Sequence, residues 1–469
     1  AISSLAAVQA IEWQDFVDYT SQVERILRAD PVAAYGSMSF ETRDKYRAVV
    51  EKLGRGANFS ETEIARKVVD YARQAGIATT QAAPSKAAPS KAAPSKASHV
   101  GYWLIDRGRE TLEHDLAYKT PVGDQIRRQM VRHGRRGYAL ALFAGFLLAM
   151  LAPVVFLLTS HAGFWSWLGG LALSLLPATV LSMTLVQWLI TALLRPRVLP
   201  SMDYRRALPD TCQTAVAVPV IVAHERDVQA MLEQLEIRHL SNPDPMLHFV
   251  LLSDLPDAGQ EHEPGDTAIE TALIAGIESL NRQYGNAATT PFYLLHRRRL
   301  YNPAESCWMG RERKRGKLEQ FNQYILQGDV GEFCVSAGAI ERLRDCRFVI
   351  TLDADTMLPP ETAAKMVGIL MHPLNMPELD PRTGKVVSGY TVVQPRLEVL
   401  PLSGPVSLFC RLYAGDTAID IYSRAVSDIY QDLFGSGIFV GKGIYDVAAF
   451  QRSLANRVPD NSILSHDLF

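Results

Sequence analysis

Two long apolar runs constrain the fold of this chain more than any other feature. Tyr138 to Leu158 and Phe164 to Leu194 contain no charged side chain, and only the five residues from Thr159 to Gly163 separate them. About 20 consecutive apolar residues are needed for a helix to cross the hydrocarbon core of a bilayer. Residues 138–194 therefore predict a transmembrane helical hairpin, because the helices of a soluble protein would carry charge on their exposed faces.

The charges around this hairpin predict its orientation. Arg135 and Arg136 precede it and Arg195 and Arg197 follow it, whereas the turn between the helices contains neither Lys nor Arg. Cytoplasmic loops of membrane proteins carry an excess of these residues. We therefore expect the turn outside the cell and both flanks in the cytoplasm. The formal net charge of the whole chain is −2, which gives no case for a nucleic-acid partner.

Three segments precede the hairpin. Residues 1–80 carry apolar side chains at helical spacing, as at Trp13, Phe16 and Val17, and predict an N-terminal helical region that is more often structural than a docking surface. Residues 81–99 contain the unit Ala-Ala-Pro-Ser-Lys three times in succession, which predicts a disordered linker. Residues 100–137 form a basic juxtamembrane segment.

The cysteines and the chain ends restrict the class of protein further. The five cysteines are widely spaced and include no Cys-x-x-Cys, which argues against a disulfide framework and a zinc knuckle. The chain starts at Ala1 without a methionine or a signal peptide. It stops at Phe469 without a terminating loop, so we expect a fragment or a processed chain.

Residues 200–469 have the pattern of an α/β domain. Apolar strands alternate with helical patterns, which indicates a parallel sheet with right-handed crossovers. The expected strands are Cys212–Ala223, Leu247–Leu252, Phe292–Leu295 and Phe348–Leu352. Ligands of such sheets bind beyond the carboxyl ends of the strands, where Glu225, Asp254 and Asp353 follow three of them.

Asp353 and Asp355 directly follow the strand from Phe348, and Pro359-Pro360 separates them from the next helix. Two carboxylates at this spacing can face one divalent cation, which would neutralise the diphosphate of a nucleotide sugar. A turn whose aspartates cap the helix is the alternative, because Asp-x-Asp also occurs by chance.

A basic run surrounds Gly316. Arg311, Arg313, Lys314, Arg315 and Lys317 lie at the expected start of a helix, where cations and free backbone N–H groups suit a diphosphate. The alternative is a solvated charged face.

The order of these motifs resembles a known family. Val218-Pro219 with Glu225, then Asp254, Gly316-Lys317 with Asn322, Asp353-Ala354-Asp355, Gln394-Pro395, Gly435-Ser436-Gly437 and His466-Asp467 resemble the inverting, metal-dependent membrane glycosyltransferases of the cellulose synthase type. Trp308 to Asn322 and Ser465 to Leu468 resemble the transferase part of cyclic β-1,2-glucan synthases. The resemblance covers nearly the whole chain apart from the repeat linker.

This resemblance implies a GT-A-like, open, mostly parallel sheet in residues 200–469, truncated at its C-terminal end. It also implies UDP-glucose as the donor, a glucan acceptor and a Mg²⁺ or Mn²⁺ cofactor. The location it implies is the inner (cytoplasmic) membrane of a bacterium, with a multi-pass chain in the bilayer and the catalytic domain in the cytoplasm. A phosphorylase-like region belongs to full-length members of the family, and nothing in this chain matches it.

The resemblance also implies a role for individual residues. Glu225 and Asp254 would hold the uridine, although capping of the next helix is an alternative for both. Lys317 would approach the diphosphate. Asp353 would bind the donor and, with Asp355, the metal. These implied donor and metal residues are Glu225, Asp254, Lys317, Asp353 and Asp355.

On the acceptor side, the resemblance assigns Gly435, Ser436 and Gly437 to acceptor binding. Asp467 would be the catalytic base that inversion requires, acting with Asp353 at the reacting centre. Such synthases use a protein hydroxyl as primer, for which Tyr301 and Tyr445 lie in suitable predicted loops. Two alternatives stay open: a synthase of another β-glucan linkage, and a catalytically idle assembly or export scaffold.

Overall fold

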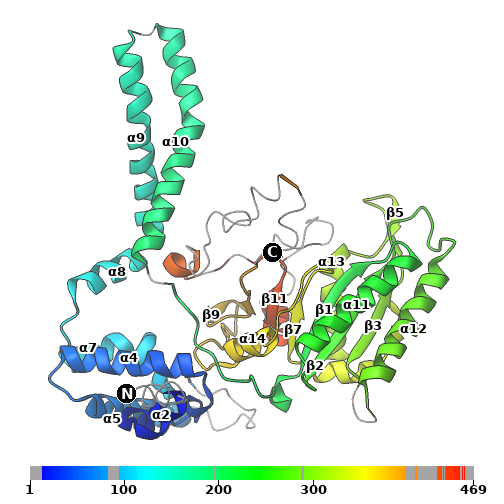
Figure 1. The fold of residues 1–469 in the computed structure, drawn as a ribbon, viewed down its shortest axis with the longest axis horizontal. Helices are drawn as coiled ribbons and strands as arrows, with labels where there is room; N and C mark the ends of the chain where they lie inside the picture. The colour runs from blue at the N-terminus through cyan, green and yellow to red at the C-terminus, as the bar shows by residue number, and fades with distance from the viewer. Residues whose placement is uncertain are drawn as a thin grey trace, which may run out of the picture. The chain divides into compact units, whose positions relative to one another are not determined.

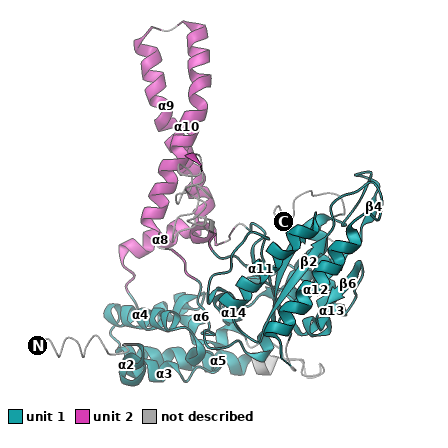
Figure 2. Ribbon diagram, turned by 45° about the vertical axis from the view of Figure 1, so that its right-hand side comes forward, with its two compact units in different colours: residues 1–118, 199–395, 439–469 teal, residues 119–198, 396–438 magenta. Residues whose placement is uncertain are grey.

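The computed structural model describes residues 13–82, 95–161, 163–194, 196–286, 290–397, 407–408, 430–435, 437, 439–454, 457 and 459. Most of the expected linker at 81–99 lies outside these ranges. The chain divides into two compact units (Figure 2). Unit 1 comprises residues 1–118, 199–395 and 439–469, and unit 2 comprises residues 119–198 and 396–438.

Unit 1 begins with a group of helices, most of which share one apolar core. They are α2 Trp13–Thr20, α3 Gln22–Leu27, α4 Phe40–Gly56, α5 Glu61–Ala82, α6 Val100–Ile105 and α7 Arg109–Asp115, with short 3₁₀ turns η1 Tyr35–Ser37 and η2 Lys96–Ser98. Leu27, Tyr46, Leu53 and Val68 are fully buried in this core. The side chains of Ser21 and Ser39 cap α3 and α4 by accepting backbone N–H groups, which explains where these helices begin.

A seven-stranded sheet forms the centre of the rest of unit 1 (Figure 1), in the order β10-β11-β7-β1-β2-β3-β6. β7, β1, β2 and β3 are parallel, and β6, β11 and β10 run antiparallel to their neighbours. The strands are β1 Thr214–Ile221, β2 Leu247–Asp254, β3 Phe292–Arg297, β6 Phe333–Ala337, β7 Phe348–Thr351, β10 Val392–Val393 and β11 Gly443–Asp446. The prediction of a mixed α/β unit with a mostly parallel sheet is thus confirmed.

Helices cover both faces of this sheet. Val216, Val218 and Val220 of β1 pack on one side with α11 Glu225–Ser241, α12 Asp266–Tyr284 and α14 Thr362–Met371. Ala215 and Ala217 pack on the other side with α13 Arg313–Gln327 and α16 Val447–Leu454. Because successive side chains of a strand point to opposite faces, a strand covered on both sides reads as a continuous apolar run.

The structure also contains elements that the sequence patterns did not predict. A hairpin joins β4 Leu300–Asn302 to β5 Cys307–Met309, and another joins β8 Glu378–Leu379 to β9 Val386–Ser388. The 3₁₀ turns η3 Asp210–Cys212 and η4 Ile340–Asp345 precede β1 and β7. Tyr445, expected in a loop, lies on β11 with only 2% of its surface exposed, so its prediction as an accessible hydroxyl was wrong.

Unit 2 contains the two apolar runs as long helices. They are α9 Gly134–Thr159 and α10 Phe164–Leu193, and both are long and apolar enough to span a membrane. Most of their large side chains are exposed, as Leu140 and Leu173 are. α8 Val122–Arg132 precedes them, and the π-helical turn η6 Tyr430–Phe434 packs on their base through Leu433, which is buried with Val186 and Ile190.

The buried His248 on β2 makes the stability of the fold depend on pH. It is 5% exposed, its Nε2 donates to Gln213 Oε1 at 3.0 Å, and the Tyr293 hydroxyl donates to its Nδ1 at 3.2 Å. Both bonds suit a neutral imidazole. Burial, reinforced by Arg342, lowers the pKa of His248 to about 4.

We predict that His248→Gln flattens the pH dependence of stability in the acid range. The unfolded chain takes up a proton near its ordinary pKa of about 6.5, whereas the folded chain resists it down to about 4. This contribution is therefore complete above the unfolded pKa and is lost as the pH falls, by up to about 1.4 kcal/mol per pH unit.

Denaturant titrations of the detergent-solubilised protein measure this slope of the unfolding free energy. His114→Gln is the matched control, because its side chain is 89% exposed, and it should leave the slope unchanged. Identical slopes for wild type and the His248 variant would show that the fold does not hold this imidazole neutral.

Candidate functional site

The carboxyl ends of β7, β1, β2 and β3 meet at one edge of the sheet, and the loop from Asp353 to Pro359 leaves β7 there. The side chains of Arg238 in α11 Glu225–Ser241 and of Asn242, which directly follows that helix, hold this loop. The buried guanidinium of Arg238 donates to the carbonyl oxygens of Ala354 at 2.6 Å and of Thr356 at 2.9 Å. Asn242 donates to the carbonyl oxygens of Leu358 and Pro359. Burial lowers the pKa of Arg238 to about 10, so it stays a cation at neutral pH.

Asp353 lies between two lysines. Lys314 in the first turn of α13 contacts Asp353 Oδ1, and Lys442 just before β11 lies 2.9 Å from Oδ2. Lys314 Nζ also reaches the carbonyl oxygen of Gly441 at 3.5 Å. Although partial burial raises the pKa of Asp353, the two ammonium groups bring it below its ordinary value. Asp355, two residues on, is exposed.

A second charged cluster lies buried behind this loop. Arg297 at the end of β3 donates from Nε and Nη2 to the two carboxylate oxygens of Asp254, both at 2.8 Å. Lys317 Nζ lies 3.0 Å from Asp254 Oδ2 and donates to the carbonyl oxygens of Val220 at 2.6 Å and Leu252 at 3.3 Å. Each of the three side chains is at most 5% exposed.

This environment explains the protonation of the buried cluster. Burial lowers the pKa of Lys317 to about 8, an effect that the Asp254 carboxylate opposes. Burial raises the pKa of Asp254, but Lys317 and Arg297 outweigh it and hold the carboxyl below its ordinary value. In this structure Lys317 is thus a brace between strands, and its contact with a donor diphosphate stays a prediction, as does that of Asp254 with uridine.

The start of α13 is built to fit over Asp254. Arg297 donates to the carbonyl oxygens of Arg311 and Arg313, both at 3.0 Å. Gly310 has no room for a side chain, because an added Cβ would lie 2.7 Å from Asp254 Oδ2. Glu312 adopts a left-handed backbone with φ of 53°, which turns the chain into the helix. The tight turn sets the position from which Lys314 reaches Asp353.

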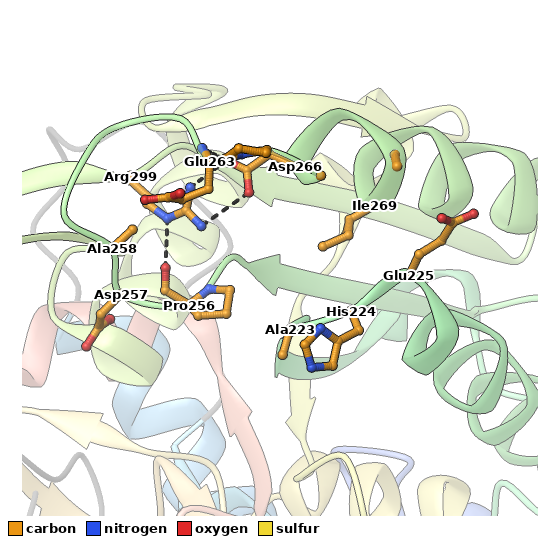
Figure 3. A pocket seen from close by; sticks show the side chains of 13 residues that line it. Ala223, His224, Glu225, Pro256, Asp257, Ala258, Glu263, Asp266, Ile269 and Arg299 are labelled. Atoms are coloured by element: carbon orange, nitrogen blue, oxygen red, sulfur yellow. Dashed lines mark hydrogen bonds and ion pairs between the residues drawn. The ribbon is translucent and has the colours of Figure 1, made fainter.

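A cavity of about 380 Å³ lies at the turns that follow β1 and β2. Figure 3 shows His224 and Glu225 of the turn from β1 into α11 on one side of it, and Arg299 with Asp266 on the other. Arg299 donates to Asp266 Oδ2 at 2.6 Å and to the carbonyl oxygen of Pro256 at 2.7 Å. Of the two predicted uridine ligands, Glu225 lines this cavity and Asp254 does not.

The residues present suit a divalent cation only in part. Among the described residues no group of three His, Cys, Asp or Glu side chains could hold a metal ion. Mg²⁺ is commonly bound by one or two carboxylates together with substrate phosphates. The exposed Asp355 carboxylate is available for such a substrate-completed site. Both oxygens of Asp353 contact lysine ammonium groups, so Asp353 could join it only if a bound diphosphate draws a lysine away.

The remaining predicted residues are not among those that form this site in the part of the chain that the structure describes. Gly435, with φ of 72°, and Gly437 belong to unit 2. Ser436 and Asp467 lie outside the described residues, so their assignments stay predictions. Tyr301 on β4 is 53% exposed, whereas the Tyr445 hydroxyl donates to Asn322 Oδ1 at 2.9 Å inside the core.

The motif order assigned no role to three residues that form this site. Lys442 belongs to none of the motifs, yet its ammonium lies against Asp353. Gln394 accepts the backbone N–H of Val440 at 2.7 Å and so holds the segment that presents Lys442. In the sequence, nothing distinguishes Arg238 from the other charged residues of an amphipathic helix. Of the three, only Gln394 carried a signal, since it belongs to the Gln394-Pro395 motif.

We predict that Asp254→Asn destabilises unit 1 by about 3–5 kcal/mol, because it leaves Arg297 and Lys317 buried without their counter-ion. Asp257→Asn is the matched control. Asp257 pairs with Arg313 at 2.8 Å, but both side chains are about two fifths exposed, so the loss should stay within about 1 kcal/mol. Urea titration measures both. A normally stable Asp254 variant would contradict the bracing role.

Comparison with known protein sequences identifies a relative of this chain. No protein-family model matches the chain. The chain is 34% identical over 468 residues to the cyclic β-(1,2)-glucan synthase NdvB of Rhizobium meliloti (strain 1021). The match covers all of this chain but only 16% of that relative. The resemblance to cyclic β-1,2-glucan synthases is thereby confirmed, and the chain is homologous along its whole length to one part of such a synthase.

Proposed function

We propose that this chain is the glucosyltransferase part of a membrane-bound cyclic β-1,2-glucan synthase, with a GT-A-type fold. It would transfer glucose from UDP-glucose to a growing β-1,2-glucan with inversion. The observation that carries the proposal is the convergence of Asp353, Lys314 and Lys442 at the carboxyl edge of the sheet, where the turns after β1 and β2 line a cavity of about 380 Å³. The homology to a named synthase supports the substrate class.

The charges of the site suit a nucleoside diphosphate sugar. In this structure both lysines pair with Asp353. A diphosphate placed beside them would accept the same ammonium groups through charge-assisted hydrogen bonds, which are stronger than neutral ones. The nucleoside would occupy the cavity that Glu225 lines, where a carboxylate can accept from the uracil N–H or the ribose hydroxyls.

The transfer itself needs a base on the side opposite the diphosphate. The acceptor 2-hydroxyl oxygen would bond to the anomeric carbon and give its proton to the Asp467 carboxylate, while the bond from that carbon to the diphosphate breaks and UDP leaves. Asp353 would orient the donor. Asp355, with Asp353, would hold Mg²⁺ or Mn²⁺, which neutralises charge on the departing diphosphate when bound.

The membrane location is part of the proposal. α9 and α10 have spanning length, and the arginines at their outer ends favour a cytoplasmic site for residues 200–469 in a bacterial inner membrane. A glucan acceptor primed on a protein hydroxyl would be bound by Gly435, Ser436 and Gly437.

The direct test is to incubate the detergent-solubilised protein with radiolabelled UDP-glucose and Mn²⁺, and to analyse the linkage of the free and protein-bound glucan. We expect a 1,2-linked product, lost on chelation of the metal and in Asp355→Ala. Another linkage would retain the enzyme class and reject the substrate assignment. Bound UDP-glucose without turnover, even with added glucan, would favour the scaffold.

We further predict that Lys442→Met weakens UDP binding about tenfold, because it removes one cation from the diphosphate. Isothermal titration with UDP measures the dissociation constant. Lys365→Met is the matched control, since this lysine of α14 is 63% exposed and pairs with Glu361, the residue just before that helix. Equal affinities for both variants would exclude Lys442 from the donor site.

A further inference from the structure

The segment of residues 122–136 in unit 2 concentrates positive charge directly before the first long apolar helix. It contains five arginines and one aspartate, Asp124. Arg127, Arg132, Arg135 and Arg136 form no ion pair with any residue that the structure describes. Unpaired cations at this density repel one another, so the segment favours an anionic partner.

α8 within this segment is amphipathic. Val122, Ile126 and Met130 follow one another at intervals of four residues and therefore form one apolar edge of the helix. Val122 is 71% exposed and Ile126 is 57% exposed, and no residue of α8 is buried. An apolar edge of this kind on a basic helix is typical of helices that lie at a membrane surface.

The arginines that follow α8 line a cavity of about 460 Å³ at the base of α9. Residues of η6 form part of the cavity wall. They pack closely against Gly134, where an added Cβ would lie 2.8 Å from the Leu433 carbonyl oxygen. The Tyr138 ring meets the Phe434 ring edge-on, with centroids 5.7 Å apart. The cavity is lined by Arg132, His133, Arg135, Arg136, Leu433 and Phe434.

We propose that residues 122–136 bind anionic phospholipid at the cytoplasmic surface of the membrane. The apolar edge of α8 would enter the acyl region, and the arginines around the cavity would bind the phosphate of the headgroup. The inference rests on the proposed membrane location of α9 and α10, and goes beyond it by naming a lipid class and a binding site.

Continuity with α9 selects lipid over other anions. α8 ends at Arg132 and α9 begins at Gly134, so the cavity lies where α9 would enter the bilayer. A soluble phosphate compound would neutralise the arginines but would leave Val122 and Ile126 in water. A phospholipid satisfies both, because one molecule has a phosphate and acyl chains.

Amide hydrogen exchange of the full chain in lipid nanodiscs tests the proposal. We expect the amides of residues 122–136 to exchange on the order of tenfold more slowly with phosphatidylglycerol in phosphatidylcholine than with phosphatidylcholine alone, because each arginine near an anionic surface adds affinity. The difference should disappear at high salt. Glycerol phosphate added to phosphatidylcholine nanodiscs should not reproduce it.

The triple variant Arg132→Gln, Arg135→Gln, Arg136→Gln should lose the lipid dependence and keep its exchange in phosphatidylcholine. The matched control carries the same change at the exposed Arg55, Arg73 and Arg282, and should behave as wild type. Ile126→Ser should weaken protection without altering the charge.

Two outcomes separate this inference from the membrane proposal. Failure of the chain to co-elute with nanodiscs of either composition would reject the membrane location itself. Co-elution with equal exchange in both lipids would leave the location intact and overturn the lipid site, as would protection that persists in the triple variant or that free glycerol phosphate reproduces.

Discussion

The bidentate ion pair between Asp254 and Arg297, buried together with Lys317, is the interaction on which the candidate site depends. Taking charges out of water costs several kcal/mol per ion unless each is paired and hydrogen-bonded. Here the three groups satisfy one another and the carbonyl oxygens of Val220, Leu252, Arg311 and Arg313. One network therefore joins β1, β2, β3 and the start of α13, and it fixes where α13 begins relative to the sheet edge.

The second half of the site is held independently. Arg238 and Asn242 bind the backbone of the loop after β7, so α11 determines where Asp353 points. The pairing of Lys314 with Asp353 joins these two supports. The first support is the buried network of charges, and the second consists of hydrogen bonds to carbonyl oxygens of the loop. Both are attached to the same sheet, so the contact between Lys314 and Asp353 depends on that sheet. The backbone on both sides of the site is thus held in place in advance. The contacts of the two lysines with one carboxylate can be exchanged for contacts with a ligand.

The sequence predicted the parts of the fold that local patterns specify. Apolar runs bounded by polar residues located the four parallel strands, and uninterrupted hydrophobicity located α9 and α10. It did not predict the antiparallel strands β6 and β11, because strands of five and four residues are too short to show a clear periodicity. Lys442 and Asp353 are distant in the chain and meet only because β11 pairs with β7. Lys317 differs from Lys442 in this respect. Its position in a basic run predicted exposure to a ligand, but the periodicity of α13 places its side chain in the core.

The late position of β11 has a consequence for biosynthesis. β7 pairs on one side with β1, which precedes it in the chain. Its other edge stays unpaired until β11 is synthesised and Ile444 pairs with Ile350. A ribosome adds roughly 5–20 residues per second, so that edge stays open for several seconds after β7 emerges, as a template for pairing with another chain. Lys442 directly precedes β11, and the strand that closes the edge therefore also delivers the second cation to Asp353. In the nascent protein, protection from misassembly and completion of the charged site would occur in the same step.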